Sequence, residues 1–217
     1  MKKIAVMAGT PVDTQMGIEL LKALPVETFF APVSKNPNEQ TFFQTLPYAK
    51  KYQRVKQQLL TLKAQGAEQV FVYCNSLSGA IDFDELAQAI ALPILTPFHA
   101  YHQLAAQYHR LGVLAANAQG AAGIERELVQ TNPAIQVYNV TNLDWVNAVE
   151  QKIPPQTIVT SFGLSDTPTF FQANQVEAIL IGCTHFPYFL ADYQKQTAIP
   201  CIDPADILLA TLKTQLA

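Results

Sequence analysis

Short, largely apolar runs alternate with longer amphipathic or polar stretches along the whole chain. There are nine such runs, at residues 4–8, 28–33, 69–73, 93–97, 111–115, 135–140, 157–161, 178–182 and 201–203. Runs without a polar residue at every second position are typical of strands that are buried on both faces of a sheet. The intervals between them have room for helices, so the pattern predicts strand–helix–strand units and mainly parallel sheets. The predicted fold class is α/β.

One interval shows a helical pattern most clearly. Residues 46–65 are rich in helix-forming residues and place apolar side chains at Val55, Leu59, Leu60 and Leu62. The pattern stops at Gly66, a residue type that commonly follows the last turn of a helix. We therefore expect a helix here between the second and third strands.

Two proline-containing interruptions divide this pattern. The first is the LPILTPFH segment at residues 92–99, and the second lies at residues 198–200. They predict two half-domains: residues 1–95 with 198–217, carrying Cys74, and residues 96–197, carrying Cys183. The segments around these cysteines share one layout, an apolar strand followed by cysteine, small polar residues and a helix-prone stretch. Two similar half-domains that face each other across a cleft would explain this layout.

Composition and charge narrow the class of partner. Of the 217 residues, 49% are hydrophobic and only 14% are charged, compared with about 25% charged in typical soluble proteins. The net charge of −3 and the absence of a basic run argue against nucleic acid or an anionic membrane surface as a partner. The longest apolar run, residues 176–183, is far shorter than the ~20 residues that cross a bilayer. Three widely spaced cysteines indicate reduced thiols, so a soluble cytoplasmic protein with a small-molecule partner is expected.

The first candidate motif is FVYCNSLSGAI at residues 71–81. Cys74 falls at the carboxyl end of a predicted strand, where open α/β sheets bind their ligands. Asn75 and Ser76 then favour the start of a helix. A thiolate beside a helix N-terminus is stabilised by free amides, which lowers the cysteine pKa from about 8.5 to ~3.5–7.5. The alternative interpretation is a small buried apolar residue.

The second candidate motif is AILIGCTHFPYF at residues 178–189. Cys183 again ends an apolar strand, and Thr184 and His185 add a hydroxyl and an imidazole. We expect His185 to support Cys183 or to bind a substrate carboxylate, the alternative being a ring packed among the following aromatic residues. Two such motifs, one in each half, are hard to explain by packing alone.

Together the motifs resemble the cofactor-independent aspartate/glutamate racemases, most closely the glutamate racemases. The Cys-Asn-Thr motif of that family appears here as Cys74-Asn75-Ser76, and its Gly-Cys-Thr-His motif as residues 182–185. Residues 202–205, IDPA, resemble the Ile-Asp-Ser-Ala segment after the last strand in those enzymes. The resemblance implies an active site in the cleft, with one thiolate that removes the α-proton and one thiol that delivers a proton to the opposite face. It implies no organic cofactor and no metal.

The resemblance also implies a set of site residues. The catalytic residues of this set are Cys74, Cys183, His185 and Asp13. The substrate-binding residues of the set are Thr10, Asn75, Ser76, Asn117 and Thr184.

The chain departs from the family pattern in two loops. In that family the serine and aspartate of an Asp-Ser-Gly loop contact the substrate amine and the first cysteine. That loop is replaced here by AGTPVDT at residues 8–14, where Thr10 and Asp13 offer the hydroxyl and the carboxylate, unless Asp13 only caps the following helix. The Pro-Tyr-Gly segment is replaced by Ser34-Lys35-Asn36-Pro37.

The predicted function is that of an isomerase, a racemase of an acidic amino acid in amino-acid metabolism. Glutamate is favoured over aspartate because histidine follows Cys183-Thr184. The alternatives are a hydantoin racemase, a cysteine-dependent cis-trans isomerase, or a catalytically silent binding protein. Pyridoxal phosphate is discounted because no lysine lies in an apolar context with a phosphate-binding glycine loop. His99 and His102 lack a nearby acidic or cysteine ligand for a metal. The expected partner is an amino-acid substrate. The sequence does not decide whether the protein also forms a homodimer.

Overall fold

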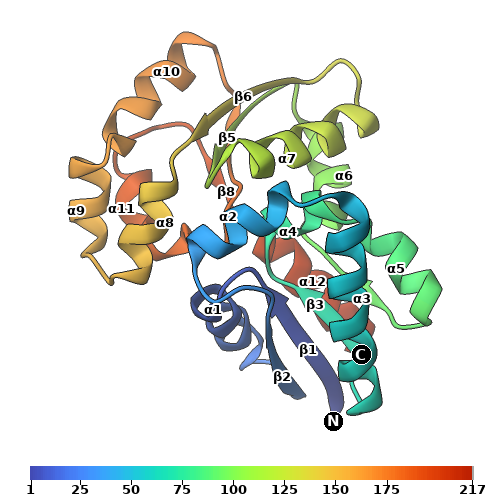
Figure 1. The fold of residues 1–217 in the computed structure, drawn as a ribbon. Coiled ribbons are helices and arrows are strands. Elements are labelled where there is room, and N and C mark those ends of the chain that lie inside the picture. The colour runs from blue at the N-terminus through green and yellow to red at the C-terminus, as the bar shows by residue number, and fades with distance from the viewer. Residues whose placement is uncertain (217) are drawn as a thin grey trace.

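The computed structural model describes residues 1–216, and two four-stranded parallel sheets form its framework (Figure 1). The first sheet has the order β2-β1-β3-β4 and the second has the order β6-β5-β7-β8. The strands of the first sheet are β1 (Lys2–Ala8), β2 (Val26–Pro32), β3 (Gln69–Val72) and β4 (Ile94–Leu95). Those of the second are β5 (Arg110–Ala115), β6 (Gln136–Thr141), β7 (Ala178–Ile181) and β8 (Cys201–Ile202). The matching strand order confirms the predicted α/β fold and the similarity of its two lobes.

Helices flank both sheets. The first lobe contains α1 (Pro11–Leu21), α2 (Pro37–Thr45), α3 (Tyr48–Ala64), α4 (Asn75–Ala80) and α5 (Phe83–Ile90). The second contains α7 (Ala118–Thr131), α8 (Leu143–Glu150), α9 (Pro155–Ser161), the short 3-10 turn Leu164–Asp166, α10 (Thr167–Ala173) and α11 (Pro187–Gln194). The predicted helix before Gly66 is confirmed as α3, and Gly66 has a φ of +100°, which favours glycine.

Eight of the nine predicted strands are confirmed, and one is wrong. Residues 157–161 belong to helix α9. Proline at the first helical position sets the backbone for a helix, and the Thr160 hydroxyl donates to the Gln156 carbonyl one turn earlier. The run TIVTS has only two apolar residues, Ile158 and Val159, and two buried neighbours fit a strand or a short helix equally well.

The lobes are joined by α6 (Phe98–Gln107) and by the return of the chain to α12 (Pro204–Leu216). Helix α12 lies beside β3 in the first lobe, where Gln69 Nε2 donates to Gln215 Oε1 at 2.8 Å. Strand β8 pairs with β7 of the second sheet, so the chain returns to the first lobe after Ile202 and not at residue 198. The boundary near residue 95 stays a proposal.

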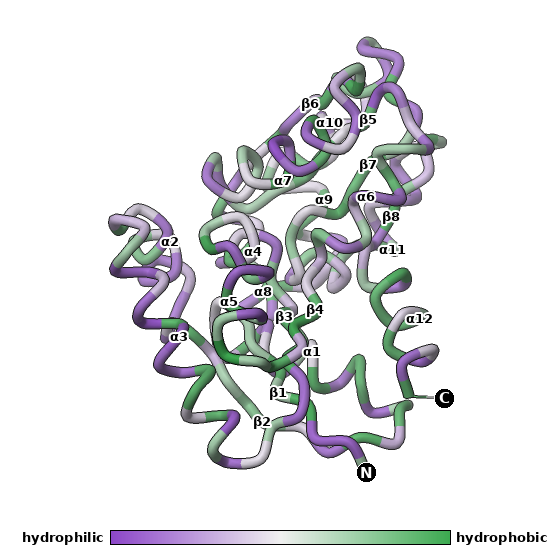
Figure 2. The backbone as a smooth tube through the Cα atoms, turned by 90° about the vertical axis from the view of Figure 1, so that its right-hand side faces the viewer, coloured by the Kyte–Doolittle hydropathy of each residue, from purple (hydrophilic) through white to green (hydrophobic). Residues whose placement is uncertain are grey.

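The hydropathy of the chain follows this architecture (Figure 2). Residues 4–8 of β1 have no exposed surface, and all four residues of β3 and of β7 are buried. Helix α3 alternates between hydrophilic and hydrophobic positions and buries Val55, Leu59 and Leu62. Among residues 1–216 no helix combines the length and the apolar character needed to cross a membrane.

A glycine pair brings the lobes into close contact behind the first cysteine motif. A Cβ atom added to Gly123 of α7 would lie 2.7 Å from the Gly79 Cα of α4, so only glycine allows the two helices to approach this closely. Arg126 Nη2 also donates to the Gly79 carbonyl at 3.0 Å. Because α4 directly follows Cys74, this contact fixes the position of Cys74 relative to the second lobe.

Candidate active site

A cavity lies between the two lobes at the carboxyl ends of the central strands. All nine residues of the predicted site line it: Thr10, Asp13, Cys74, Asn75, Ser76, Asn117, Cys183, Thr184 and His185. They follow β1, β3, β5 and β7, which are the two inner strands of each sheet. The tertiary structure therefore brings together residues that are up to 175 positions apart, although their predicted roles stay proposals.

Cys74 is the residue that precedes α4, and its side chain is 5% exposed. Burial, together with the nearby Asp13 carboxylate, raises the pKa of the Cys74 thiol to about 12. The Ser76 hydroxyl, 3.5 Å from Cys74 Sγ, opposes this rise only in part. The expectation of a lowered pKa is wrong, because loss of solvent outweighs the amides of a six-residue helix. Cys74 is therefore the protonated thiol of the site.

Cys183 has a different set of neighbours. Its Sγ lies 3.8 Å from His185 Nδ1, and His185 Nε2 lies 3.0 Å from Glu150 Oε1. Glu150 also accepts a hydrogen bond from the Thr10 hydroxyl at 2.6 Å. The second thiol thus stands at one end of a thiol–imidazole–carboxylate series.

Burial alone disfavours the charged form of His185, which is 3% exposed. The hydrogen bonds to Cys183 and Glu150 outweigh burial and raise the pKa of His185 to about 10. Partial burial raises the pKa of Glu150, but the hydrogen bonds from His185 and Thr10 outweigh it and lower the pKa. The pair is consequently an imidazolium and a carboxylate at neutral pH, which places a positive charge next to Cys183.

Asp13 caps the helix that follows it and also lines the cavity, so its predicted functional role stays a proposal. Its side chain accepts from the Thr10 amide at 2.6 Å and from the Gly9 amide at 3.2 Å, which completes the capping box of α1. It also lines the cavity and accepts from the Thr184 hydroxyl of the second lobe at 3.4 Å. Burial raises the pKa of Asp13, while the His185 charge and the Thr10 hydrogen bonds oppose the rise.

Asn75 and Asn117 line the cavity and form hydrogen bonds with neighbouring elements. The Asn75 side-chain carbonyl accepts from the buried Tyr101 hydroxyl. Asn117 caps α7 by accepting from the Gly120 amide and donates to the Thr41 hydroxyl of α2 at 3.3 Å.

Several residues at the site were not found from the sequence. Gln40, Thr41 and Gln44 of α2 line the cavity, and Glu150, at the end of α8, contacts the lining residues Thr10 and His185. Nothing in the local sequence marks Glu150. The repeat of glutamine at positions 40 and 44 was a usable signal, because residues four apart lie on one face of a helix.

His99 and His102 lie outside this cavity and have structural partners. His99 contacts Thr96 and Asp84, and His102 contacts Thr131 and Glu127. Within residues 1–216, no three side chains from histidine, cysteine, aspartate and glutamate gather as a metal site.

The His185 imidazolium leads to a pH-dependent stability. Its pKa is raised from 6.5 to about 10 on folding, so its stabilising contribution is complete below pH 6.5 and is lost as the pH rises through 10. We expect the difference in unfolding free energy between the wild-type protein and His185→Asn to shrink over this interval in urea titrations. His109→Asn, at an exposed histidine, serves as the control. A His185 difference that stays constant or grows with pH would contradict this assignment.

Comparison with known proteins adds independent information. Residues 36–212 match the family model described as Asp/Glu/hydantoin racemase. A glutamate racemase of Picosynechococcus sp. is 25% identical over 213 residues, which cover 92% of this chain and 73% of that protein. The structure of glutamate racemase from Francisella tularensis in complex with D-glutamate has a TM-score of 0.78 at 18% identity, covering 99% of this chain and 81% of that one. Picrophilus torridus aspartate racemase has a TM-score of 0.73 at 17% identity, with 100% and 94% covered.

Proposed function

The chain belongs to the Asp/Glu/hydantoin racemase family, and on that basis we propose that it inverts the α-carbon of a free acidic amino acid with Cys74 and Cys183 as its proton-transferring groups. One observation carries the proposal: two buried thiols, one from each lobe, line the same cavity. They follow β3 and β7, which occupy equivalent places in the two sheets. Two similar lobes that face each other can present one thiol to each face of a substrate carbon.

The reaction balances with these two groups alone. A thiolate on one face removes the α-proton, and the electron pair of the C–H bond stays on the substrate as a carbanion. The thiol on the opposite face then donates its proton to that carbon, which completes inversion and exchanges the protonation states of the two cysteines. Proton transfer by positioned groups contributes about 10²–10⁴-fold to the rate.

The neighbours of the two cysteines support a defined starting state. Cys183 Sγ lies 3.8 Å from Nδ1 of the His185 imidazolium, while burial beside Asp13 keeps the proton on Cys74. In the proposed reaction, Cys183 faces the α-hydrogen of one enantiomer and Cys74 delivers a proton to the opposite face. Family resemblance makes this the L-enantiomer.

The carboxylates of the substrate would be held by neutral donors. Within the described chain, residues 1–216, the cavity wall contains no lysine or arginine. Asn75, Ser76 and Thr184 flank the thiols and offer amide and hydroxyl groups, and Asn117 lies at the start of α7. Fixed dipoles of this kind stabilise charge that develops in a transition state.

We favour glutamate over aspartate as the substrate. A His185 imidazolium tolerates a nearby substrate carboxylate, which a glutamate side chain at this position would repel. One methylene is worth only about 1–3 kcal/mol of discrimination, so the preference is expected to be modest.

The three free cysteines fit a reducing compartment such as the cytoplasm.

Incubation in deuterated water tests the reaction class. We expect L- and D-glutamate each to acquire deuterium at Cα together with inversion, and glutamate to have a higher kcat/KM than aspartate. Both are measured by NMR and chiral chromatography. Exchange on a substituted hydantoin but on neither amino acid would favour the hydantoin racemase. Binding without exchange would favour the silent binding protein.

A further inference from the structure

Helix α2 presents two glutamines one turn apart to the cavity. Gln40 and Gln44 are 6% and 5% exposed, and both line the cavity wall. Each has one buried amide atom without a hydrogen-bond partner, Nε2 of Gln40 and Oε1 of Gln44. An unpaired buried polar atom costs about 1–3 kcal/mol. Two of them at one cavity indicate that a ligand supplies the missing partners.

The amide of Gln40 is held in one orientation. The Ser34 hydroxyl donates to Gln40 Oε1 at 2.9 Å, which leaves the Nε2 hydrogens unpaired. The side chain also packs against the backbone of Gly9, where an added Cβ would lie 3.0 Å from Gln40 Cδ. Gln40 therefore offers a fixed donor to the cavity, and a fixed donor selects an acceptor group.

Neighbouring side-chain amides are already engaged. Gln44 Nε2 donates to Ser76 Oγ at 2.8 Å, and Asn117 Nδ2 donates to Thr41 Oγ1 at 3.3 Å. Asp13 of the wall, and Glu150, which hydrogen-bonds to Thr10 and His185 of the wall, would repel a carboxylate. The distal carboxylate of an acidic amino acid therefore fits best against α2, at Gln40 Nε2.

We propose that Gln40, oriented by Ser34 and Gly9, is the specificity-determining donor that binds the side-chain carboxylate of the substrate. The proposal rests on the proposed function for the substrate class, and it assigns a task to the segment that departs from the family pattern. Ser34 begins the SKNP segment that stands in place of Pro-Tyr-Gly. Residues beside the thiols hold the reacting end of the substrate, and α2 recognises its other end.

Two substitutions of Gln40 test the proposal by calorimetric titration with D-glutamate and D-glutamine. Gln40→Met keeps the length of the side chain and removes the donor, so D-glutamate binding should weaken about 10- to 100-fold. Gln40→Glu presents an acceptor, so it should weaken D-glutamate binding further and shift the preference towards D-glutamine. A reversed preference is a result that a merely structural role would not produce.

Gln69→Met is the matched control. Gln69 is an equally buried glutamine of the first lobe with an unpaired Oε1, and it does not line the cavity. This variant should leave both affinities unchanged. Gln40→Met and Gln40→Glu variants that fold and keep the wild-type ratio of the two affinities would overturn the proposal, as would a wild-type protein that does not bind D-glutamate. A wild-type protein that binds D-glutamate with the expected Gln40 dependence but does not exchange its α-proton would sustain this inference and refute the racemase.

Discussion

Replacing either cavity cysteine by serine is expected to reduce racemisation about 10²–10⁴-fold or more. Each inversion needs one group to remove the α-proton and a second to deliver a proton, so Cys74→Ser and Cys183→Ser should each impair both directions. A serine hydroxyl is a far weaker acid than a thiol and yields almost no alkoxide at neutral pH. Initial rates from L- and D-glutamate provide the measurement, because the equilibrium constant between enantiomers must stay at one.

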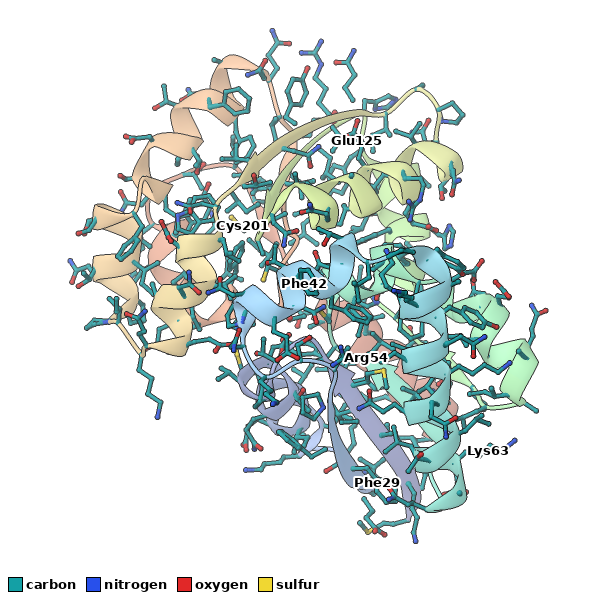
Figure 3. The ribbon with its side chains drawn as sticks, viewed as in Figure 1. Phe29, Phe42, Arg54, Lys63, Glu125 and Cys201 are labelled. Carbon is teal, nitrogen blue, oxygen red and sulfur yellow. The ribbon has the colours of Figure 1, made fainter. Side chains whose placement is uncertain are left out.

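The third cysteine provides an internal control for this experiment. Cys201 lies in β8 of the second lobe, is partly buried and does not line the cavity (Figure 3). Cys201→Ser should therefore retain the wild-type rate. Near wild-type turnover by a folded Cys74→Ser or Cys183→Ser protein would refute the two-thiol mechanism.

Two substitutions of Asp13 are expected to separate its structural role from its chemical one. Asp13→Leu leaves the Gly9 and Thr10 amides and the Thr184 hydroxyl without their acceptor, so the unfolding free energy should fall by about 3 kcal/mol. Asp13→Asn keeps an acceptor and removes a carboxylate whose charge is disfavoured by burial, so its stability should change by less than about 1 kcal/mol. The uncharged amide is a poorer partner for the substrate ammonium, and kcat/KM should fall at least about 10²-fold.

Denaturant titration and initial rates on the same preparations measure the two effects. Asp82→Asn is the control, because Asp82 is an exposed residue that caps α5 by accepting from the Glu85 amide. This variant should change neither quantity appreciably. If Asp13→Asn turns over glutamate as fast as the wild-type protein, Asp13 only caps α1.

The sequence by itself determined the framework and the two thiols. Eight strands were visible as apolar runs, and for the inner strands β1, β3, β5 and β7 the reason is that burial on both faces of a sheet imposes a local composition. Both cysteines were placed at the carboxyl ends of strands for the same local reason. The motif resemblance then identified nine residues that share one cavity.

The local sequence pattern gave a wrong prediction where a strand and a helix fit it equally well. The apolar residues of 157–161 fit a strand, and the proline at position 155 starts a helix there instead. The return of the chain to the first lobe was predicted at residue 198 and occurs after Ile202. Strand β8 stays in the second sheet because it pairs with β7, a strand that is distant in sequence.

Only the tertiary structure decided the electrostatics and the outer wall of the site. Burial of Cys74 comes from packing between lobes, and it reverses the pKa shift expected from the helix start alone. Glu150 reaches His185 across 35 positions, and Ser34 orients Gln40 over a cavity completed by the other lobe. Solvent exclusion and hydrogen-bond partners depend on what surrounds a side chain in space, which the order of residues along a chain specifies only through the complete fold.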